Sequence, residues 1–265
     1  MVSAGAGTAE LLVALSRRAP AELAARLRMT AVERTPRPVS LDQRITWAAT
    51  VPESVSGVVV LTEWLSRVPV DVVELTPDGP RLTLVDPLTG MERPGPRPRE
   101  SDLYWLDRWW PLRYTGDRSE IGRSRDETWT AVVRRLSRGV ALAVDYAHDR
   151  STRPPDGTLI GHRAGREVRP VPDGSCDITA QVALDACAAA GEKAGATATA
   201  LVDQRTALRA LGVLGRKPRL AQASTDPAAY LRALQRAGIE AELLEQTGLQ
   251  WLTQTVGIEL PALLR

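Results

Sequence analysis

Four short stretches of this 265-residue chain place glycines or carboxylates where a sheet would present them to a ligand. Gly5-Ala6-Gly7 stands between a few β-prone residues and an apolar-periodic stretch, which predicts a tight turn from a strand into a helix. Three later strand-like segments each end in a carboxylate, at Glu33, Glu63 and Asp145. Because parallel α/β sheets bind ligands beyond the carboxyl ends of their strands, we expect these residues to share one site.

The glycine turn narrows the choice of ligand. A dinucleotide fingerprint G-x-G-x-x-G would need glycine at position 10, where the chain has Glu10, and there is no Walker lysine. A cofactor with a ribose but no phosphate is compatible, and S-adenosylmethionine is the main candidate. Glu33 would accept hydrogen bonds from both ribose hydroxyls through its two oxygens. The alternatives are an ordinary tight turn at residues 5–7 and a solvated strand end at Glu33.

Glu63 follows the clearest buried strand, GVVVLTE, and would face the reacting end of a cofactor that lies across the sheet. There it could orient a guanidinium by bidentate hydrogen bonds. The alternative is a carboxylate at a helix start, where the helix dipole favours negative charge. Asp145, Tyr146 and His148 end another buried strand and could line the pocket, although a lone histidine is more often structural.

A tryptophan-rich stretch contains Trp105, Trp109 and Trp110. Aromatic faces bind cations, so this stretch could form a substrate platform. The favoured interpretation is that these residues belong to the core or cover a hydrophobic groove. The chain has no phenylalanine, so tryptophan and leucine must supply the bulky packing.

Strand-like and helix-like patterns alternate along the chain, which predicts an α/β fold with a mainly parallel sheet and helices on both faces. We expect strands at residues 28–33, 45–49, 57–63, 139–145 and 197–203, and helical segments at 8–18, 21–27, 124–137, 204–211, 226–237 and within 177–190. Hairpins are expected around Pro77-Asp78-Gly79 and between Gly157 and Arg169, and residues 94–98 are expected to form a loop. We interpret residues 1–265 as one domain, with a hairpin and Trp-rich insertion at about 70–135 and a C-terminal strand and helices at about 197–265.

Composition limits the possible partners and location. A net charge of +2 with no basic stripe gives no support for a nucleic-acid partner. Cys176 and Cys187 lack histidines at metal-binding spacing, so we expect a reduced pair and no metal site. No apolar run reaches membrane-spanning length and no signal peptide is visible, so we expect a cytoplasmic protein without a membrane partner. The oligomeric state stays open.

Several segments together resemble the MidA-type S-adenosylmethionine-dependent methyltransferases, a family that includes the mitochondrial complex I assembly-factor protein arginine methyltransferase. The resemblance runs over residues 2–190, and its segments occur in the family's order: VSAGAGTAELL, TAVERTPRP, GVVVLTEWLSRVPVDVVEL, SEIGRSRDETW, GVALAVDYAHD and GSCDITAQVAL.

The resemblance implies a class I methyltransferase (Rossmann-like) fold, bound S-adenosylmethionine, and methyl transfer to a nitrogen, with arginine in a protein as one possible acceptor and a small molecule as another. By position, Gly5, Ala6 and Gly7 with Glu33 and Glu63 would contact the cofactor, and Glu63 and Asp145 would be catalytic. Tyr146, Asp177 and Thr179 would bind substrate.

The chain departs from the family pattern at Ala9, Thr62, Ser66, Ala147 and Gln181. The family's region before the glycine turn is also missing from this sequence. The loss of an aspartate at Ser66 would weaken a two-carboxylate clamp on arginine. The sequence therefore supports two hypotheses, an active N-methyltransferase and a catalytically degenerate relative that acts as a binding or assembly module. A nicotinamide-dependent dehydrogenase is disfavoured by Glu10.

Overall fold

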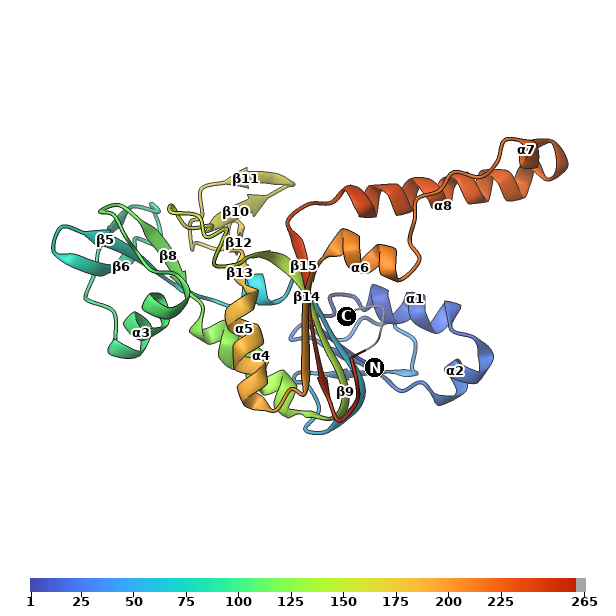
Figure 1. The fold of residues 1–265 in the computed structure, drawn as a ribbon, viewed down its shortest axis with the longest axis horizontal. Helices are drawn as coiled ribbons and strands as arrows, with labels where there is room; N and C mark the ends of the chain where they lie inside the picture. The colour runs from blue at the N-terminus through green and yellow to red at the C-terminus, as the bar shows by residue number, and fades with distance from the viewer. Residues whose placement is uncertain (261–265) are drawn as a thin grey trace.

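The computed structural model describes residues 1–260, and a central sheet dominates it (Figure 1). Seven of its eight strands follow one another across the sheet, and the short β13 (Val182–Ala183) pairs with the end of β9. The order is β14 (Ala198–Asp203), β15 (Leu249–Val256), β9 (Leu136–His148), β4 (Val55–Thr62), β1 (Val2–Ala4), β2 (Met29–Val32) and β3 (Ile45–Ala48).

The sheet is mainly parallel, as the sequence predicts. β1, β2, β3, β4 and β9 pair in parallel, so the ends of β1, β2 and β4 lie at one edge. β15 runs antiparallel to both of its neighbours, β14 and β9. The sequence pattern does not predict this strand, because β15 carries three consecutive polar residues that are fully buried, Thr253, Gln254 and Thr255.

Helices cover both faces of the sheet (Figure 1). α4 (Arg123–Arg134) and α5 (Leu184–Ala194) pack on one face, and α1 (Glu10–Arg18), α2 (Ala21–Arg26) and α6 (Gln204–Ala210) lie on the other. The main core forms between the sheet and the α4–α5 pair, where Leu61, Trp129 and Leu252 are completely buried. Burial of side chains of this size contributes about 1.5–3 kcal/mol each, so this interface fixes the sheet against the helices.

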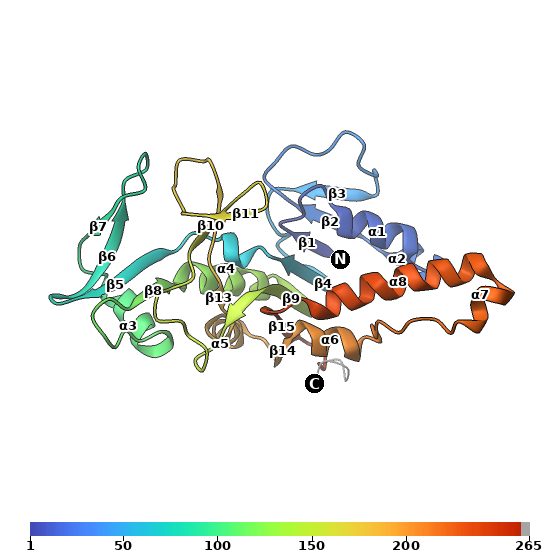
Figure 2. The same ribbon diagram turned by 90° about the horizontal axis from the view of Figure 1, so that it is seen from above.

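Most of the segment between β4 and β9, up to the start of α4, forms a lobe at the end of the sheet where β9 terminates (Figure 2). It contains η1 (Leu65–Arg67), β5 (Asp71–Thr76), β6 (Gly79–Val85), β7 (Glu92–Pro94), α3 (Glu100–Trp109) and β8 (Arg118–Ile121). The predicted hairpin is confirmed, with Thr76 opposite Gly79. Pro94 belongs to strand β7 rather than to the expected loop, because residues 92–94 pair with β6. Trp105 and Trp110 are buried in a core cluster that the lobe shares with Ala183 of β13 and Ala186 of α5.

Two smaller units complete the molecule. β10 (Ile160–Arg163), β11 (Arg166–Val168) and β12 (Asp177–Thr179) form a three-stranded sheet, which confirms the second predicted hairpin. α7 (Ala221–Thr225) and α8 (Pro227–Glu245) extend away from the sheet as an arm (Figures 1 and 2). Among the helices of residues 1–260, none combines the length and apolar composition that crossing a bilayer demands.

Candidate active site

The glycine turn after β1 is held against the end of β2. The N–H groups of Gly5 and Ala6 both donate to the carbonyl of Val32, at 3.0 and 3.2 Å. Gly5 and Gly7 have φ angles of +67° and +57°, a backbone conformation that residues other than glycine rarely adopt. A Cβ on Gly5 would lie 2.6 Å from Trp64 Cδ1, so the missing side chain lets the Trp64 ring rest on the turn.

Glu33 faces this turn from the end of β2. Its Oε2 accepts a hydrogen bond from the Gly7 N–H at 3.1 Å, and its Oε1 accepts one from the Arg34 N–H at 2.7 Å. Within residues 1–260 it forms no ion pair. An ionised carboxylate has about four lone-pair positions, so about two remain for a pair of ribose hydroxyls. The structure thus brings Gly5, Ala6, Gly7 and Glu33 together, as the sequence predicts.

Glu63 lies at the end of β4 in a left-handed conformation, with φ of +46°. Its N–H donates to the carbonyl of Val144 at 2.8 Å, which fixes the backbone against β9. The side chain is exposed and has no hydrogen-bond or ion-pair partner in the described part of the chain. The next residue, Trp64, rests on Gly5, so Glu63 is held at the edge that also carries the glycine turn. A strained backbone with a free carboxylate is typical of a functional position.

Asp145 is buried rather than open to a ligand, with 1% of its surface exposed. Its Oδ2 accepts a hydrogen bond from the Ser66 N–H at 3.1 Å, and burial raises the pKa of this carboxyl. The carboxylate therefore caps the short helix η1 that follows Glu63. In this arrangement Asp145 positions the turn that carries Glu63.

Arg125, on α4, holds the same turn from the other side and was not singled out by the sequence analysis. It is 2% exposed, and its guanidinium donates to the carbonyls of Ser66 at 3.0 Å and Gln181 at 2.7 Å. Burial lowers its pKa. Sequence gives no signal for this role, because Arg125 donates to the backbone carbonyls of Val68, Gln181 and Ser66, and any residue supplies such a carbonyl.

The position of Ser66 does not fit the idea that an aspartate there would complete a two-carboxylate clamp on arginine. Its side chain is buried, and its backbone is bonded to Asp145 and Arg125. A carboxylate at this position would lie inside the protein beside Asp145, where two buried like charges repel. The expectation that Ser66 removes a second carboxylate from the substrate edge is therefore wrong for this structure.

The three predicted substrate residues lie on two different strands. Tyr146 follows Asp145 on β9 and is 43% exposed. Asp177 and Thr179 lie on β12, which adjoins the turn after β4 through a hydrogen bond from the Ala180 N–H to the Ser66 carbonyl, at 3.2 Å. None of the three lines the cavity beside the glycine turn. Their substrate role stays a prediction.

A cavity of about 410 Å³ opens beside the turn, and its lining includes Gly5, Glu33 and Trp64. The loop after β3, residues 67–69 and one face of α4 form its remaining walls. This volume falls in the range of small-molecule sites, which is roughly 300–1,000 Å³. Of the predicted cofactor residues, Gly5 and Glu33 line this cavity, and Ala6, Gly7 and Glu63 do not. The open backbone at Gly5, the free lone pairs of Glu33 and the aromatic wall fit a cofactor with a ribose.

The strand order, the antiparallel β15 and the glycine turn after β1 define a class I methyltransferase fold, which confirms the predicted fold class. Residues 5–202 match a protein family described as "Putative S-adenosyl-L-methionine-dependent methyltransferase". The chain belongs to this family, and S-adenosylmethionine is the family's cofactor.

Two solved structures from Burkholderia thailandensis share the fold. One, an uncharacterized protein, has 24% identity and a TM-score of 0.80, over 99% of this chain and 75% of its own. The other, a candidate methyl transferase bound to S-adenosyl-homocysteine, has 24% identity and a TM-score of 0.76, over 97% of this chain and 71% of its own. No curated protein matches the chain.

Proposed function

We propose that the protein transfers a methyl group from S-adenosylmethionine to a nitrogen atom, with a guanidinium as the first candidate acceptor, and that it belongs to the MidA-type branch of its family. The observation that carries this proposal is the free, exposed carboxylate of Glu63, held on a left-handed backbone beside the glycine turn. The similar B. thailandensis structure with S-adenosyl-homocysteine supports the choice of cofactor.

Each residue of the site has a task in this proposal. The cofactor supplies a methyl group on a positively charged sulfur. Glu33 accepts hydrogen bonds from the ribose hydroxyls, and the residue 5–7 turn lets the cofactor approach the backbone. Glu63 would accept hydrogen bonds from N–H groups of the acceptor and so orient its nitrogen toward the methyl carbon. As the C–N bond forms and the C–S bond breaks, the proton that the nitrogen loses would pass to the Glu63 carboxylate and from there to solvent. Orientation of this kind can supply on the order of 7–11 kcal/mol.

The positive charge of a guanidinium favours Glu63 as its partner, because bidentate carboxylate–guanidinium pairs combine charge with a fixed geometry. Asp145 and Arg125 hold the turn that carries Glu63, and they perform no chemistry in this proposal. The MidA-type assignment rests on the order of the six matching segments in residues 2–190.

Calorimetry with S-adenosyl-homocysteine tests cofactor binding. The parent protein should bind it, and Glu33→Gln should weaken binding about tenfold or more, because two charge-assisted hydrogen bonds become neutral. Glu53→Gln is the matched control, since Glu53 is exposed at the opposite edge of the sheet, just before β4. A parent protein that does not bind S-adenosyl-homocysteine would contradict the proposal.

Transfer of a radiolabelled methyl group to arginine- and lysine-containing peptides tests the role of Glu63. We expect Glu63→Gln to lower the rate about a hundredfold or more, with little change in S-adenosyl-homocysteine binding. Glu53→Gln should keep the parent rate. Equal rates in the two variants would remove Glu63 from the reaction. Cofactor binding without transfer to any nitrogen acceptor would favour a binding module instead.

A further inference from the structure

A second cavity, of about 680 Å³, shares no lining residue with the first. Its walls are the end of α3 with the loop that follows, residues 107–114, the start of β8, residues 117–119, and the loop after β9, residues 150–155. The proposed methyl-transfer site does not use this cavity. Its lining combines two tryptophans with five arginines.

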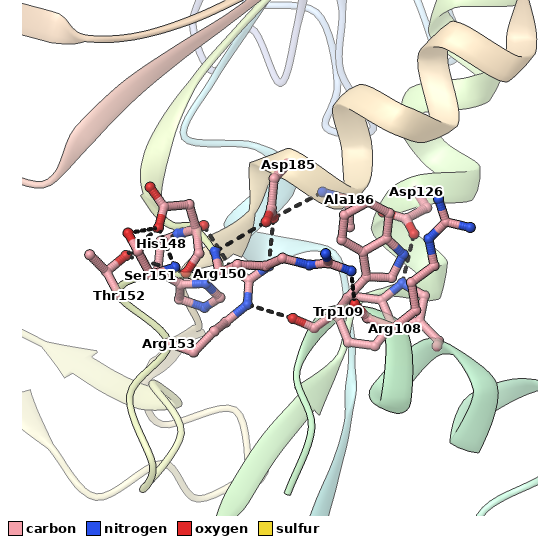
Figure 3. Close-up of polar contacts among 12 residues, drawn as sticks. Arg108, Trp109, Asp126, His148, Arg150, Ser151, Thr152, Arg153, Asp185 and Ala186 are labelled. Carbon is pink, nitrogen blue, oxygen red and sulfur yellow. Dashed lines mark hydrogen bonds and ion pairs between the residues drawn. The ribbon is translucent and has the colours of Figure 1, made fainter.

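Trp109 in this cavity is already in contact with the protein's own cations (Figure 3). The guanidinium carbons of Arg108 and Arg150 lie 4.9 and 5.0 Å from the centre of its ring. Both distances are within the range of cation–π attraction. The tryptophan platform that the sequence suggested for a cationic ligand is thus occupied by arginines, and it presents positive charge to the cavity.

On the inner wall of the cavity, the charged arginine has an ion-pair partner and hydrogen bonds connect the neighbouring segments. Arg153 pairs with Asp185 at 2.5 Å and donates to the carbonyls of Trp109 at 2.9 Å and His148 at 2.8 Å. Trp110 is buried and donates its indole N–H to the carbonyl of Pro154 at 3.2 Å. These bonds join the end of α3 to the loop after β9 and so fix the position of this wall.

The outer wall has an excess of positive charge. Arg108, Arg113 and Arg150 are exposed and form no ion pair within residues 1–260. Asp117 also lines the cavity and offsets one of these three charges; its carboxylate accepts hydrogen bonds from the N–H groups of Arg113 and Tyr114 at 2.8 and 2.9 Å. The exposed Asp107 is the other carboxylate in the lining.

From this arrangement we infer that the cavity is a binding site for a small organic anion, which carries at least two carboxylate or phosphate groups on an apolar body. The oxyanion groups would pair with the guanidiniums of Arg108 and Arg113, and with that of Arg150, which also donates a hydrogen bond to the Arg108 carbonyl. The apolar body would pack on Leu112 and Pro155, which also line the cavity. Guanidiniums match carboxylate and phosphate oxygens in bidentate geometry, which gives selectivity for such groups over neutral molecules.

Calorimetry with benzene-1,3,5-tricarboxylate tests this site, and benzene-1,3,5-tricarboxamide is the neutral molecule of the same shape. We expect the tricarboxylate to bind with a dissociation constant below about 1 mM and the tricarboxamide to bind at least about tenfold more weakly. The double variant Arg108→Gln/Arg113→Gln should weaken tricarboxylate binding by about tenfold or more, because it removes two charged partners. Arg163→Gln/Arg166→Gln, an exposed pair on β10 and β11, should leave it unchanged.

Three results would overturn the inference: no tricarboxylate binding by the parent protein, equal binding by the Arg108/Arg113 variant, or inorganic phosphate binding as tightly as the tricarboxylate. The last result would mean that the apolar walls contribute nothing. Circular dichroism checks that the variant is folded. S-adenosyl-homocysteine binding is measured on the same samples, so this site and the cofactor site are scored separately.

Discussion

At the scale of a single residue, Glu63 has a left-handed backbone and a carboxylate without a partner in the described residues. Neither property stabilises the fold. Its φ of +46° is in the left-handed region, which costs a side-chain-bearing residue about 1–2 kcal/mol. Its carboxylate gains no hydrogen bond or ion pair within residues 1–260 to offset this cost. Glycine would suit the backbone better, so the strained glutamate is best explained by a role for its side chain.

Replacement of Glu63 by glycine should therefore separate stability from function. We expect Glu63→Gly to raise the free energy of unfolding by about 0.5–1 kcal/mol, the relief of strain less the greater entropy of glycine in the unfolded chain. Methyl transfer should be lost. Ala164→Gly is the matched control, since Ala164 also has a left-handed φ, +50°, and lies outside the site. It should gain similar stability in urea unfolding and keep activity. A destabilised Glu63→Gly protein would contradict the argument.

The sequence predicts the candidate site where the signal is local. Residues 5–7, Glu33 and Glu63 are visible because each follows an apolar strand, and parallel strands bring their ends together. The burial of Asp145 and Ser66 and the role of Arg125 are not visible, because their partners are backbone atoms from segments distant in sequence. A residue that bonds to backbone leaves no complementary residue type for a pattern to reveal.

At the scale of elements, the same limit explains why β15 was not predicted while its neighbours were. Gln254 is fully buried on β15, where it accepts from the Trp129 indole N–H at 2.6 Å and donates to the Ala188 carbonyl at 2.7 Å. These bonds tie β15 to α4 and α5 and satisfy a polar group that would otherwise be costly to bury. A hydropathy pattern cannot distinguish such a satisfied glutamine from an exposed one.

Gly191 on α5 shows the consequence for the packing of these elements. A Cβ at Gly191 would lie 1.8 Å from Gln254 Oε1. Helix propensity alone predicts that Gly191→Ala stabilises the protein by about 1 kcal/mol. We expect the opposite, a loss of about 1–3 kcal/mol, because the added methyl displaces a bonded side chain in a filled core. Urea unfolding measures the change.

The matched control is Gly238→Ala on α8, where a Cβ would meet nothing within 4 Å. This variant should gain about 1 kcal/mol, as helix propensity predicts. If Gly191→Ala also stabilises the protein, the close approach of α5 and β15 does not contribute to the free energy of unfolding.

At the scale of the whole molecule, buried Asp126 and His148 have opposite effects on how the free energy of unfolding changes in acid. Burial raises the pKa of Asp126 from 3.8 to about 6, and burial, with the charges of Arg153 and Arg125, lowers the pKa of His148 from 6.5 to about 3. Stability from Asp126 is present at low pH and is lost as the pH rises toward 6. Stability from His148 is present above pH 6.5 and is lost as the pH falls toward 3.

Between about pH 4 and pH 6 the two effects cancel. In the unfolded chain Asp126 is ionised and His148 is protonated, whereas the folded protein holds the proton on Asp126 and keeps His148 neutral. Each state binds one proton at this pair, so the pair adds no slope to the dependence of unfolding free energy on pH. Neutral His148 can then accept from the Arg153 guanidinium at Nδ1.

Single substitutions should reveal how each group alone changes the free energy of unfolding with pH. Relative to the parent protein, Asp126→Asn should lose about 1.4 kcal/mol of unfolding free energy per unit as the pH falls from 6 to 4, because only His148 then titrates. His148→Gln should show the reverse, a relative loss of the same size as the pH rises from 4 to 6. Urea unfolding across this range measures both, and the double variant should again parallel the parent. If the curves of both single variants run parallel to that of the parent, the pKa values of Asp126 and His148 do not change on folding.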